Sequence, residues 1–274
     1  MIERVAVWGA GGMLGRAVTA ELRLMGVPVL EVYHHEAAGG RVGAAIDNVS
    51  EVERVHRLGI KIDAVINCAG LIPARFNSPV EMARANAVGP HVLNTFCTRY
   101  DIPLFHVSTD CVFDGKLAPP ARYAPLDALT ARDHYGRTKI AGESSSALVV
   151  RTSFIGPDHG VLAWLLQASG VEPLAGYERA LWTGSTVWAV ARALARMVVE
   201  NAQHHPIGIE HLATADVISK ADVLELVNQA LGLGLTIERY PEPATNRALV
   251  PTVELPPFEH ELAELARRCR RGTS

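Results

Sequence analysis

A tyrosine and a lysine, Tyr135 and Lys139, stand four residues apart in the segment YGRTK. At this spacing two side chains lie on the same face of a helix. A phenol has a reference pKa of about 10, so it exchanges protons poorly at neutral pH unless a neighbouring positive charge brings that pKa down. The pair therefore predicts proton transfer at a substrate oxygen; the alternative is a solvent-exposed pair on an amphipathic helix.

Two hydroxyl side chains, Ser108 and Thr109, follow a predicted strand at residues 104–107. Ligands of open α/β sheets bind at the carboxyl ends of the strands, so a hydroxyl at this place can hold a substrate oxygen. We favour Thr109 over Ser108 for this role. Tyr135, Lys139 and Thr109 are thus the predicted catalytic residues.

A glycine-rich turn, with glycines at 9, 12 and 15, lies between a predicted strand at residues 5–8 and a predicted helix at residues 14–25. A chain without side chains can turn tightly there and bring backbone N–H groups against a pyrophosphate at the positive end of the helix. The turn predicts dinucleotide binding, and the expected contacts are Gly9, Gly12, Met13 and Leu14.

The end of the second predicted strand bears on the choice between NAD(H) and NADP(H). A preference for NAD usually shows as an acidic residue that binds the ribose diol, but the residues here are Tyr33, His34 and His35. Glu36 comes slightly late, whereas Arg41 or a histidine could lie near a 2'-phosphate. NADP(H) is therefore favoured over NAD(H), with His34 as a contact; a solvated loop is the open alternative.

Polar and small residues after the next strands complete the predicted cofactor path. Asp47 is placed to hydrogen-bond the adenine amino group, and the small side chains after the fourth strand would let the dinucleotide pass. For Asn86, support of the active site and simple exposure stay open. The expected contacts are Asp47, Asn48, Cys68, Ala69 and Gly70.

The elements that position these residues alternate between strand and helix. Such alternation predicts an α/β protein of Rossmann type, with a doubly wound parallel sheet covered by helices on both faces. The predicted strands are residues 5–8, 29–33, 42–46, 64–68, 104–107 and 147–150.

The alternation of strands and helices becomes irregular after about residue 151, where prolines and glycines interrupt it. We expect a helix at 187–200, a strand ending at His211, a helix N-capped by Ser219 that runs through residue 231, and a last helix at 259–270. This predicts a dinucleotide-binding domain at 1–156, completed by 185–213, and a smaller C-terminal substrate-binding lobe at 157–274.

The composition excludes several classes of partner. A net charge of -3 and a pI of about 6.4 provide no positive field for nucleic acid or an anionic membrane. No apolar run approaches the roughly 20 residues of a membrane span, and the start of the chain does not resemble a signal peptide. The four cysteines are too scattered for a metal motif and suit reduced thiols. We expect a cytoplasmic protein without a metal, with a homodimer as an open assembly.

The same residues resemble the extended short-chain dehydrogenase/reductases and, within them, the dTDP-4-dehydrorhamnose reductase-like proteins. The STDxVFDG pattern is the most specific part of this resemblance, because general members of the superfamily do not carry it. The similar segments are GAGGMLG at 9–15, NCAG at 67–70, RANAVGP at 84–90, HVSTDCVFDG at 106–115, YGRTKIAGE at 135–143 and RTSFIG at 151–156.

The resemblance implies NAD(P)H-dependent reduction of a 4-keto sugar linked to a nucleoside diphosphate. Tyr135 would protonate the forming alkoxide and Thr109 would hold its oxygen. Lys139 would bind the nicotinamide ribose and tune Tyr135. The smaller lobe would cover the sugar nucleotide, with Trp182 and Arg247 as substrate contacts.

The resemblance also leaves alternatives. Related 4,6-dehydratases have a glutamate after Thr-Asp; this chain has Cys111 there, which argues against dehydration. GDP-fucose synthases use a cysteine at this place as an epimerisation base with a distant histidine, so an epimerase-reductase using Cys111 and a partner such as His159 stays open beside an inert, packed Cys111. A non-catalytic, dinucleotide-binding regulatory subunit is the other alternative.

Overall fold

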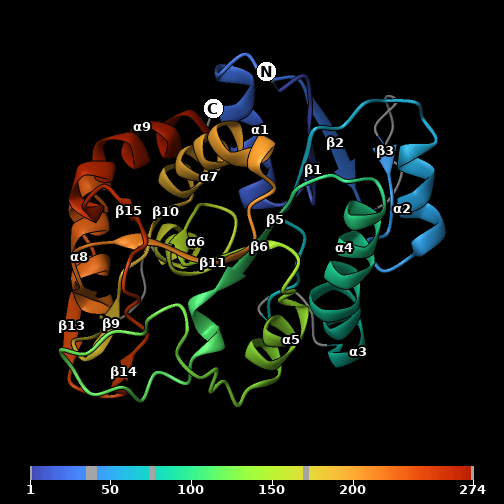
Figure 1. The fold of residues 1–274 in the computed structure, drawn as a ribbon. Helices are drawn as coiled ribbons and strands as arrows, with labels where there is room; N and C mark the ends of the chain where they lie inside the picture. The colour runs from blue at the N-terminus through green and yellow to red at the C-terminus, as the bar shows by residue number, and fades with distance from the viewer. Residues whose placement is uncertain (1, 35–41, 74–77, 169–172, 273–274) are drawn as a thin grey trace. The chain divides into compact units, whose positions relative to one another are not determined.

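The computed structural model describes residues 2–34, 42–73, 78–168 and 173–272 (Figure 1). The chain forms two compact units, and each unit is built from three separate segments of the sequence. The first unit comprises Met1–Val112, Ala131–Arg151 and Ala191–Glu210, and the second comprises Phe113–Thr130, Thr152–Val190 and His211–Ser274.

This division differs from the predicted one at residue 156, because Phe113–Thr130 belongs to the second unit. The reason is a set of long-range contacts inside that unit. The Asn246 side chain donates to the carbonyls of Leu117 (3.1 Å) and Ala121 (2.8 Å), and Tyr123 forms a β-bridge with Leu249. None of these pairings is close in sequence.

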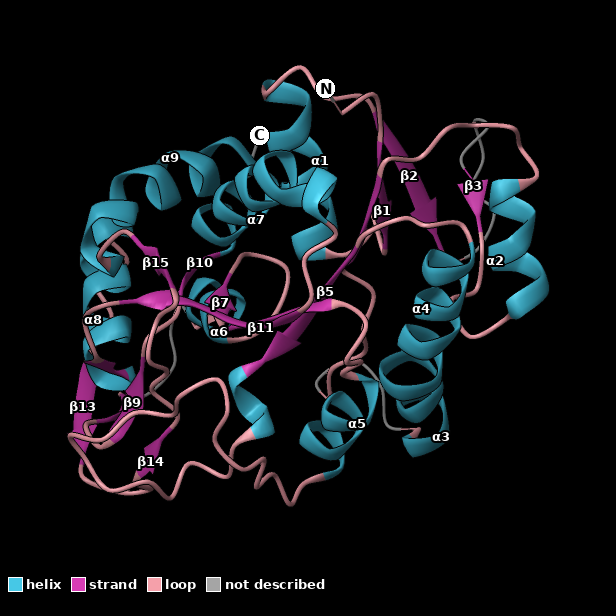
Figure 2. Ribbon diagram, in the orientation of Figure 1, coloured by secondary structure: helices cyan, strands magenta, loops and turns pink. Residues whose placement is uncertain are grey.

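Among the described residues, six strands of the parallel sheet lie wholly or mostly in the first unit, in the order β3-β2-β1-β4-β5-β6. Of these, β1, β2, β3 and β5 are labelled in Figure 2. The strand order is that of the Rossmann fold, so the predicted fold class is confirmed. The bounds are β1 Val5–Trp8, β2 Val29–Tyr33, β3 Val42–Gly43, β4 Ala64–Asn67, β5 Leu104–Thr109 and β6 Leu148–Thr152.

Four strands differ from their predicted bounds. β4 ends at Asn67 instead of residue 68, and β6 spans Leu148–Thr152 instead of residues 147–150. β3 ends at Gly43 instead of residue 46, because the Ala45 N–H turns to the Glu51 carboxylate (2.7 Å) and leaves the ladder. β5 continues to Thr109 instead of ending at residue 107, and all six of its residues are buried. Ser108 and Thr109 therefore belong to the strand itself.

The helices of the first unit follow the strands as the pattern predicts. Their caps are local: the Asn48 side chain accepts hydrogen bonds at the start of α2, and Asp133 does so for α5. The bounds are α1 Met13–Leu24, α2 Val49–His56, α3 Pro79–Ala83, the π-helical turn η1 Arg84–Val88, α4 Gly89–Arg99, η2 Asp110–Val112, α5 His134–Gly142 and η3 Ala202–His204; α7 Val187–Asn201 continues into this unit.

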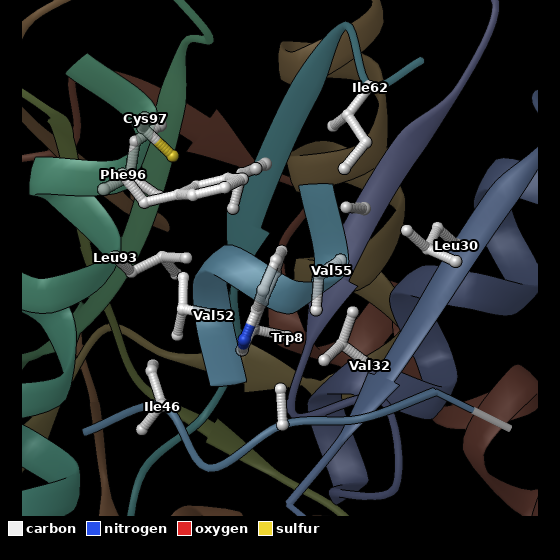
Figure 3. Packing of buried hydrophobic residues seen from close by; sticks show 14 of the residues in the cluster. Trp8, Leu30, Val32, Ile46, Val52, Val55, Ile62, Leu93, Phe96 and Cys97 are labelled. Atoms are coloured by element: carbon white, nitrogen blue, oxygen red, sulfur yellow. The ribbon is translucent and has the colours of Figure 1, made fainter. Parts of the chain in front are cut away.

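The hydrophobic core of this unit lies on both faces of the sheet. Trp8 of β1 packs among residues of α2 and α4, with its ring 6.1 Å from that of Phe96 (Figure 3). The alternate residues of β1, Val5 and Val7, are also fully buried, although they point to the opposite face. Burial on both faces makes β1 a central strand, with its carboxyl end beside the glycine-rich turn.

In its described residues the second unit holds short strands, the helices α6, α8 and α9, and the start of α7. β8 Leu174–Tyr177 pairs with β13 Ile237–Tyr240, β7 Phe154–Ile155 pairs with β10 Ser185–Thr186, and β9 Ala180–Trp182 lies between β12 Ile218–Ser219 and β14 Thr245–Asn246. The remaining elements are α6 Val161–Gln167, α8 Lys220–Leu231, β15 Val253–Leu255, η4 Phe258–Glu261, α9 Leu262–Gly272 and most of β11 Gly208–Thr214, which begins in the first unit.

The expected N-cap of α8 is confirmed as a capping box: the Ser219 hydroxyl accepts from the Asp222 N–H and the Asp222 carboxylate accepts from the Ser219 N–H. The strand expected to end at His211 continues to Thr214, because residues 212–214 pair with β15. Among the described residues, no helix is long and apolar enough to cross a membrane.

Candidate active site

Helix α5 places Tyr135 and Lys139 one turn apart, directly against the residues that follow β5. The helix can approach these residues closely because position 136 is a glycine. A Cβ at this position would lie 2.4 Å from the Cys111 carbonyl oxygen and 2.5 Å from the Ala131 Cβ. A glycine is therefore needed between the two predicted catalytic side chains for α5 to approach the end of the strand.

The Tyr135 phenol hydrogen-bonds to the Thr109 side chain. Thr109 is itself buried; its hydroxyl donates to the Asp110 carboxylate (3.1 Å) and accepts from the Cys111 N–H (3.1 Å). Two of the three predicted catalytic residues thus meet at the carboxyl end of β5.

The pKa of Tyr135 is raised, which corrects the expectation that its surroundings bring it down. Burial of the phenol is the largest cause, and the neighbouring Cys111 adds to it, whereas the hydrogen bond with Thr109 opposes it. The phenol is consequently protonated at neutral pH. A protonated phenol is the form that donates a proton to an oxygen.

The Lys139 ammonium is buried and donates a hydrogen bond to the Val107 carbonyl of β5 (2.8 Å). Burial lowers the pKa of Lys139 to about 8, against the opposing charge of Glu143. A Cβ on Gly70 would lie 3.9 Å from the ammonium nitrogen. Lys139 is thus close to the NCAG segment that the sequence assigns to the cofactor path.

Ser108 is occupied by a buried network that sequence reasoning missed. Its hydroxyl donates to Glu143 Oε1 (2.6 Å), and Arg151 binds both oxygens of the same carboxylate, with Nε 2.9 Å from Oε1 and Nη2 2.7 Å from Oε2. The side chains of Glu143 and Arg151 are 8% and 1% exposed. This engagement of Ser108 favours Thr109 as the hydroxyl that faces substrate.

Asn86 is fully buried, so the exposure alternative is excluded. It lies in the π-helical turn η1, and its amide both accepts from the Leu71 N–H (2.8 Å) and donates to the Leu71 carbonyl (2.9 Å). It also donates to Thr138 Oγ1 of α5 (3.2 Å). Asn86 therefore ties Leu71, the residue after the NCAG segment, to the helix that carries Tyr135 and Lys139.

The glycine-rich turn has the close backbone approaches that a pyrophosphate cradle needs. Gly9 has φ +74°, and a Cβ there would lie 2.7 Å from the Ala69 backbone. A Cβ on Gly15 would lie 2.1 Å from the Gly9 carbonyl oxygen, so α1 can start this close to the turn only with glycine. Met13 and Leu14 form the buried first turn of α1. The turn therefore fits a dinucleotide.

Two other residues predicted to contact the cofactor, Asp47 and Asn48, are engaged in interactions within the protein. Asp47 pairs with Arg84 (2.9 Å), and Asn48 caps α2 through the N–H groups of Ser50 (3.1 Å) and Glu51 (3.3 Å). Burial raises the pKa of the Cys68 thiol to about 12. His34 is exposed, whereas the predicted alternatives His35, Glu36 and Arg41 lie outside the described residues.

The second unit contains a cavity of about 520 Å³ with Trp182 on its wall. Trp182 is held there by a hydrogen bond from its indole N–H to Ser153 Oγ (2.8 Å) and by an edge contact with Phe258. Trp164, Tyr177 and Lys220 also line the cavity. Arg247 is not part of this wall: its guanidinium Nε donates to the Phe113 carbonyl (3.1 Å).

The strand order, the glycine turn and the Tyr135–Thr109 contact define a Rossmann-type α/β protein with a polar site at the carboxyl end of its sheet. The chain belongs to the family described as RmlD substrate binding domain, whose model matches residues 3–249.

Curated relatives agree with this family. The chain is 37% identical over 164 residues to a dTDP-4-dehydrorhamnose reductase of Mycobacterium tuberculosis; this alignment covers 56% of the chain and 50% of the relative. It is 28% identical over 260 residues to one of Mycolicibacterium smegmatis, covering 89% and 76%. The more identical match thus spans about half the length of the curated relative.

Solved structures show the same fold. A dTDP-4-dehydrorhamnose reductase from Clostridium acetobutylicum superposes with a TM-score of 0.82 at 19% identity, covering 97% of this chain and 99% of that one. A dTDP-4-dehydrorhamnose reductase from Bacillus anthracis, solved in complex with NADP, gives a TM-score of 0.81 at 18% identity, covering 98% and 100%.

Proposed function

We propose that the protein is an NAD(P)H-dependent reductase of a nucleotide-linked 4-keto (deoxy)sugar. The observation that carries the proposal is the contact between the half-buried Tyr135 side chain and Thr109 at the end of β5, with Lys139 one helical turn away. The names of the curated relatives support the substrate class.

The chain's own groups divide the work of a carbonyl reduction. Thr109 orients the substrate oxygen, and Tyr135, whose pKa is raised by burial, holds a proton to give to that oxygen as negative charge develops there. Lys139 brings a positive charge into a buried site and binds the ribose of the cofactor. When bound, the reduced nicotinamide supplies the hydride.

The two units take different parts of the reaction in this proposal. The first unit binds the dinucleotide along the glycine turn, with NADP(H) favoured over NAD(H). The second unit binds the nucleotide sugar, and its cavity beside Trp182 and Tyr177 offers aromatic faces for a ring system. We further propose a cytoplasmic enzyme without nucleic-acid partners, and a homodimer as its assembly.

The test is oxidation of NADPH and NADH by the purified protein in the presence of a panel of 4-keto sugar nucleotides, followed at the absorbance of the reduced cofactor. We expect turnover with at least one dTDP-linked 4-keto-6-deoxy sugar. Binding of cofactor without turnover of any substrate would favour the regulatory-subunit alternative and contradict the proposal.

A second activity, epimerisation before reduction, is favoured by the position of Cys111, whose backbone N–H donates to the Thr109 hydroxyl (3.1 Å) and which also raises the pKa of Tyr135. If Cys111 is a base, the protein should exchange deuterium from solvent into carbons next to the keto group, and Cys111→Ser should abolish this exchange while reduction of the keto group continues. Exchange that is unchanged in Cys111→Ser would eliminate the epimerase alternative.

A further inference from the structure

Arg16 lies beside the glycine-rich turn, and the proposed mechanism does not use it. Arg16, in the first turns of α1, donates from Nη1 to the Gly11 carbonyl (2.6 Å). Tyr33, the last residue of β2, packs on the same glycine, since a Cβ on Gly11 would lie 3.1 Å from its ring. Gly11 thus connects the guanidinium of Arg16 with the end of β2.

The end of β2 is where Rossmann proteins distinguish the two dinucleotides. A carboxylate near this place hydrogen-bonds the adenosine ribose of NAD, whereas an arginine accommodates the 2'-phosphate of NADP. Glu31, the carboxylate of β2, is engaged by the Arg23 guanidinium and by the Tyr33 hydroxyl. Tyr33 and then His34 take the following positions.

We infer that Arg16 is the residue that selects NADP(H), by binding the 2'-phosphate of the adenosine ribose. This inference rests on the proposed function, because it assumes that the glycine turn holds a dinucleotide. Arg16 is an exposed residue, and the planar guanidinium of an arginine can bond two phosphate oxygens through parallel N–H groups. Its bond to Gly11 holds it beside the pyrophosphate turn, so little side-chain freedom remains to be lost on binding.

The inference is tested by calorimetric binding of two probes that take no part in hydride transfer, adenosine 2',5'-bisphosphate and 5'-ADP. We expect the wild type to bind the 2'-phosphorylated probe more tightly. Arg16→Gln keeps a donor for the Gly11 carbonyl but removes the charge, so it should weaken binding of the bisphosphate by about 10- to 100-fold. Binding of 5'-ADP should change by less than about threefold, and Arg16→Lys should retain part of the preference.

Arg57→Gln is the matched control, since Arg57 also donates from its guanidinium to a backbone carbonyl, that of Ser50 (3.3 Å), but lies at the far end of α2. Its binding of both probes should equal that of the wild type. Equal weakening of both probes by Arg16→Gln, or no preference in the wild type, would overturn the inference and leave the reductase proposal standing. Failure of the wild type to bind either probe would overturn the dinucleotide site and the inference together.

Discussion

Tyr135→Phe is expected to lower kcat for keto-sugar reduction by about 10²- to 10⁴-fold, the usual contribution of a positioned proton donor. The substitution removes the hydroxyl that hydrogen-bonds to Thr109 and leaves the aromatic ring that packs in the site. Because the change acts on proton transfer and not on the glycine turn, the Kd for the reduced cofactor should change little. Single-turnover rates and fluorescence titration of the cofactor measure the two effects separately.

Tyr240→Phe provides the matched control for the loss of a phenol. Tyr240 is exposed on β13 and its hydroxyl donates only to Glu238 (2.6 Å) among the hydrogen bonds of the described residues, so its removal should leave kcat unchanged. A Tyr135→Phe rate within about tenfold of the wild type would show that the proton comes from another group, and the assignment of Tyr135 would be wrong.

The parts of this molecule that the sequence predicted are those with local signals. Apolar runs and turn residues are enough to locate the strands of the first unit, and Ser219 predicts the start of α8 because a capping box needs only residues three positions apart. Tyr135 and Lys139 are likewise four residues apart on one helix. Local spacing therefore sufficed for α5, although it could not show what the helix packs against.

The missed features depend on contacts between distant segments. The network of Ser108, Glu143 and Arg151 joins β5, the end of α5 and β6, and none of its spacings is a recognised motif. The raised pKa of Tyr135 follows from burial, which residue types alone do not give. Asn86 could be placed only once η1 was seen to be a π-helical turn that points its amide at Leu71.

Glu143→Gln is expected to lower the free energy of unfolding by about 3–5 kcal/mol, because it leaves the buried Arg151 guanidinium without a countercharge. Urea unfolding measures this loss. The double variant Glu143→Gln/Arg151→Met removes both charges and should recover much of the lost stability. If the double variant is as unstable as the losses of Glu143→Gln and of Arg151→Met alone added together, the pair is not coupled and this account of the network is wrong.

The same substitution should change how reduction depends on pH, because Glu143 is the first charge that opposes the lowering of the Lys139 pKa. In the wild type the ammonium is present below a pKa of about 8 and is lost as the pH rises through that value, so kcat/KM should fall above about pH 8. Without the Glu143 charge the pKa of Lys139 is lower, and the fall in kcat/KM should begin at a lower pH.

The shift in pH separates electrostatic positioning from a structural role. A carboxylate that merely held α5 together would, when removed, reduce kcat/KM by the same factor at every pH and leave the position of the fall unchanged. Glu242→Gln removes an exposed charge paired with Arg179 (3.0 Å). It should change neither the size of kcat/KM nor the pH at which kcat/KM falls. If the fall in kcat/KM moves to a lower pH in Glu143→Gln but not in Glu242→Gln, the buried Glu143–Arg151 pair sets the protonation of Lys139, on which the proposed reaction depends.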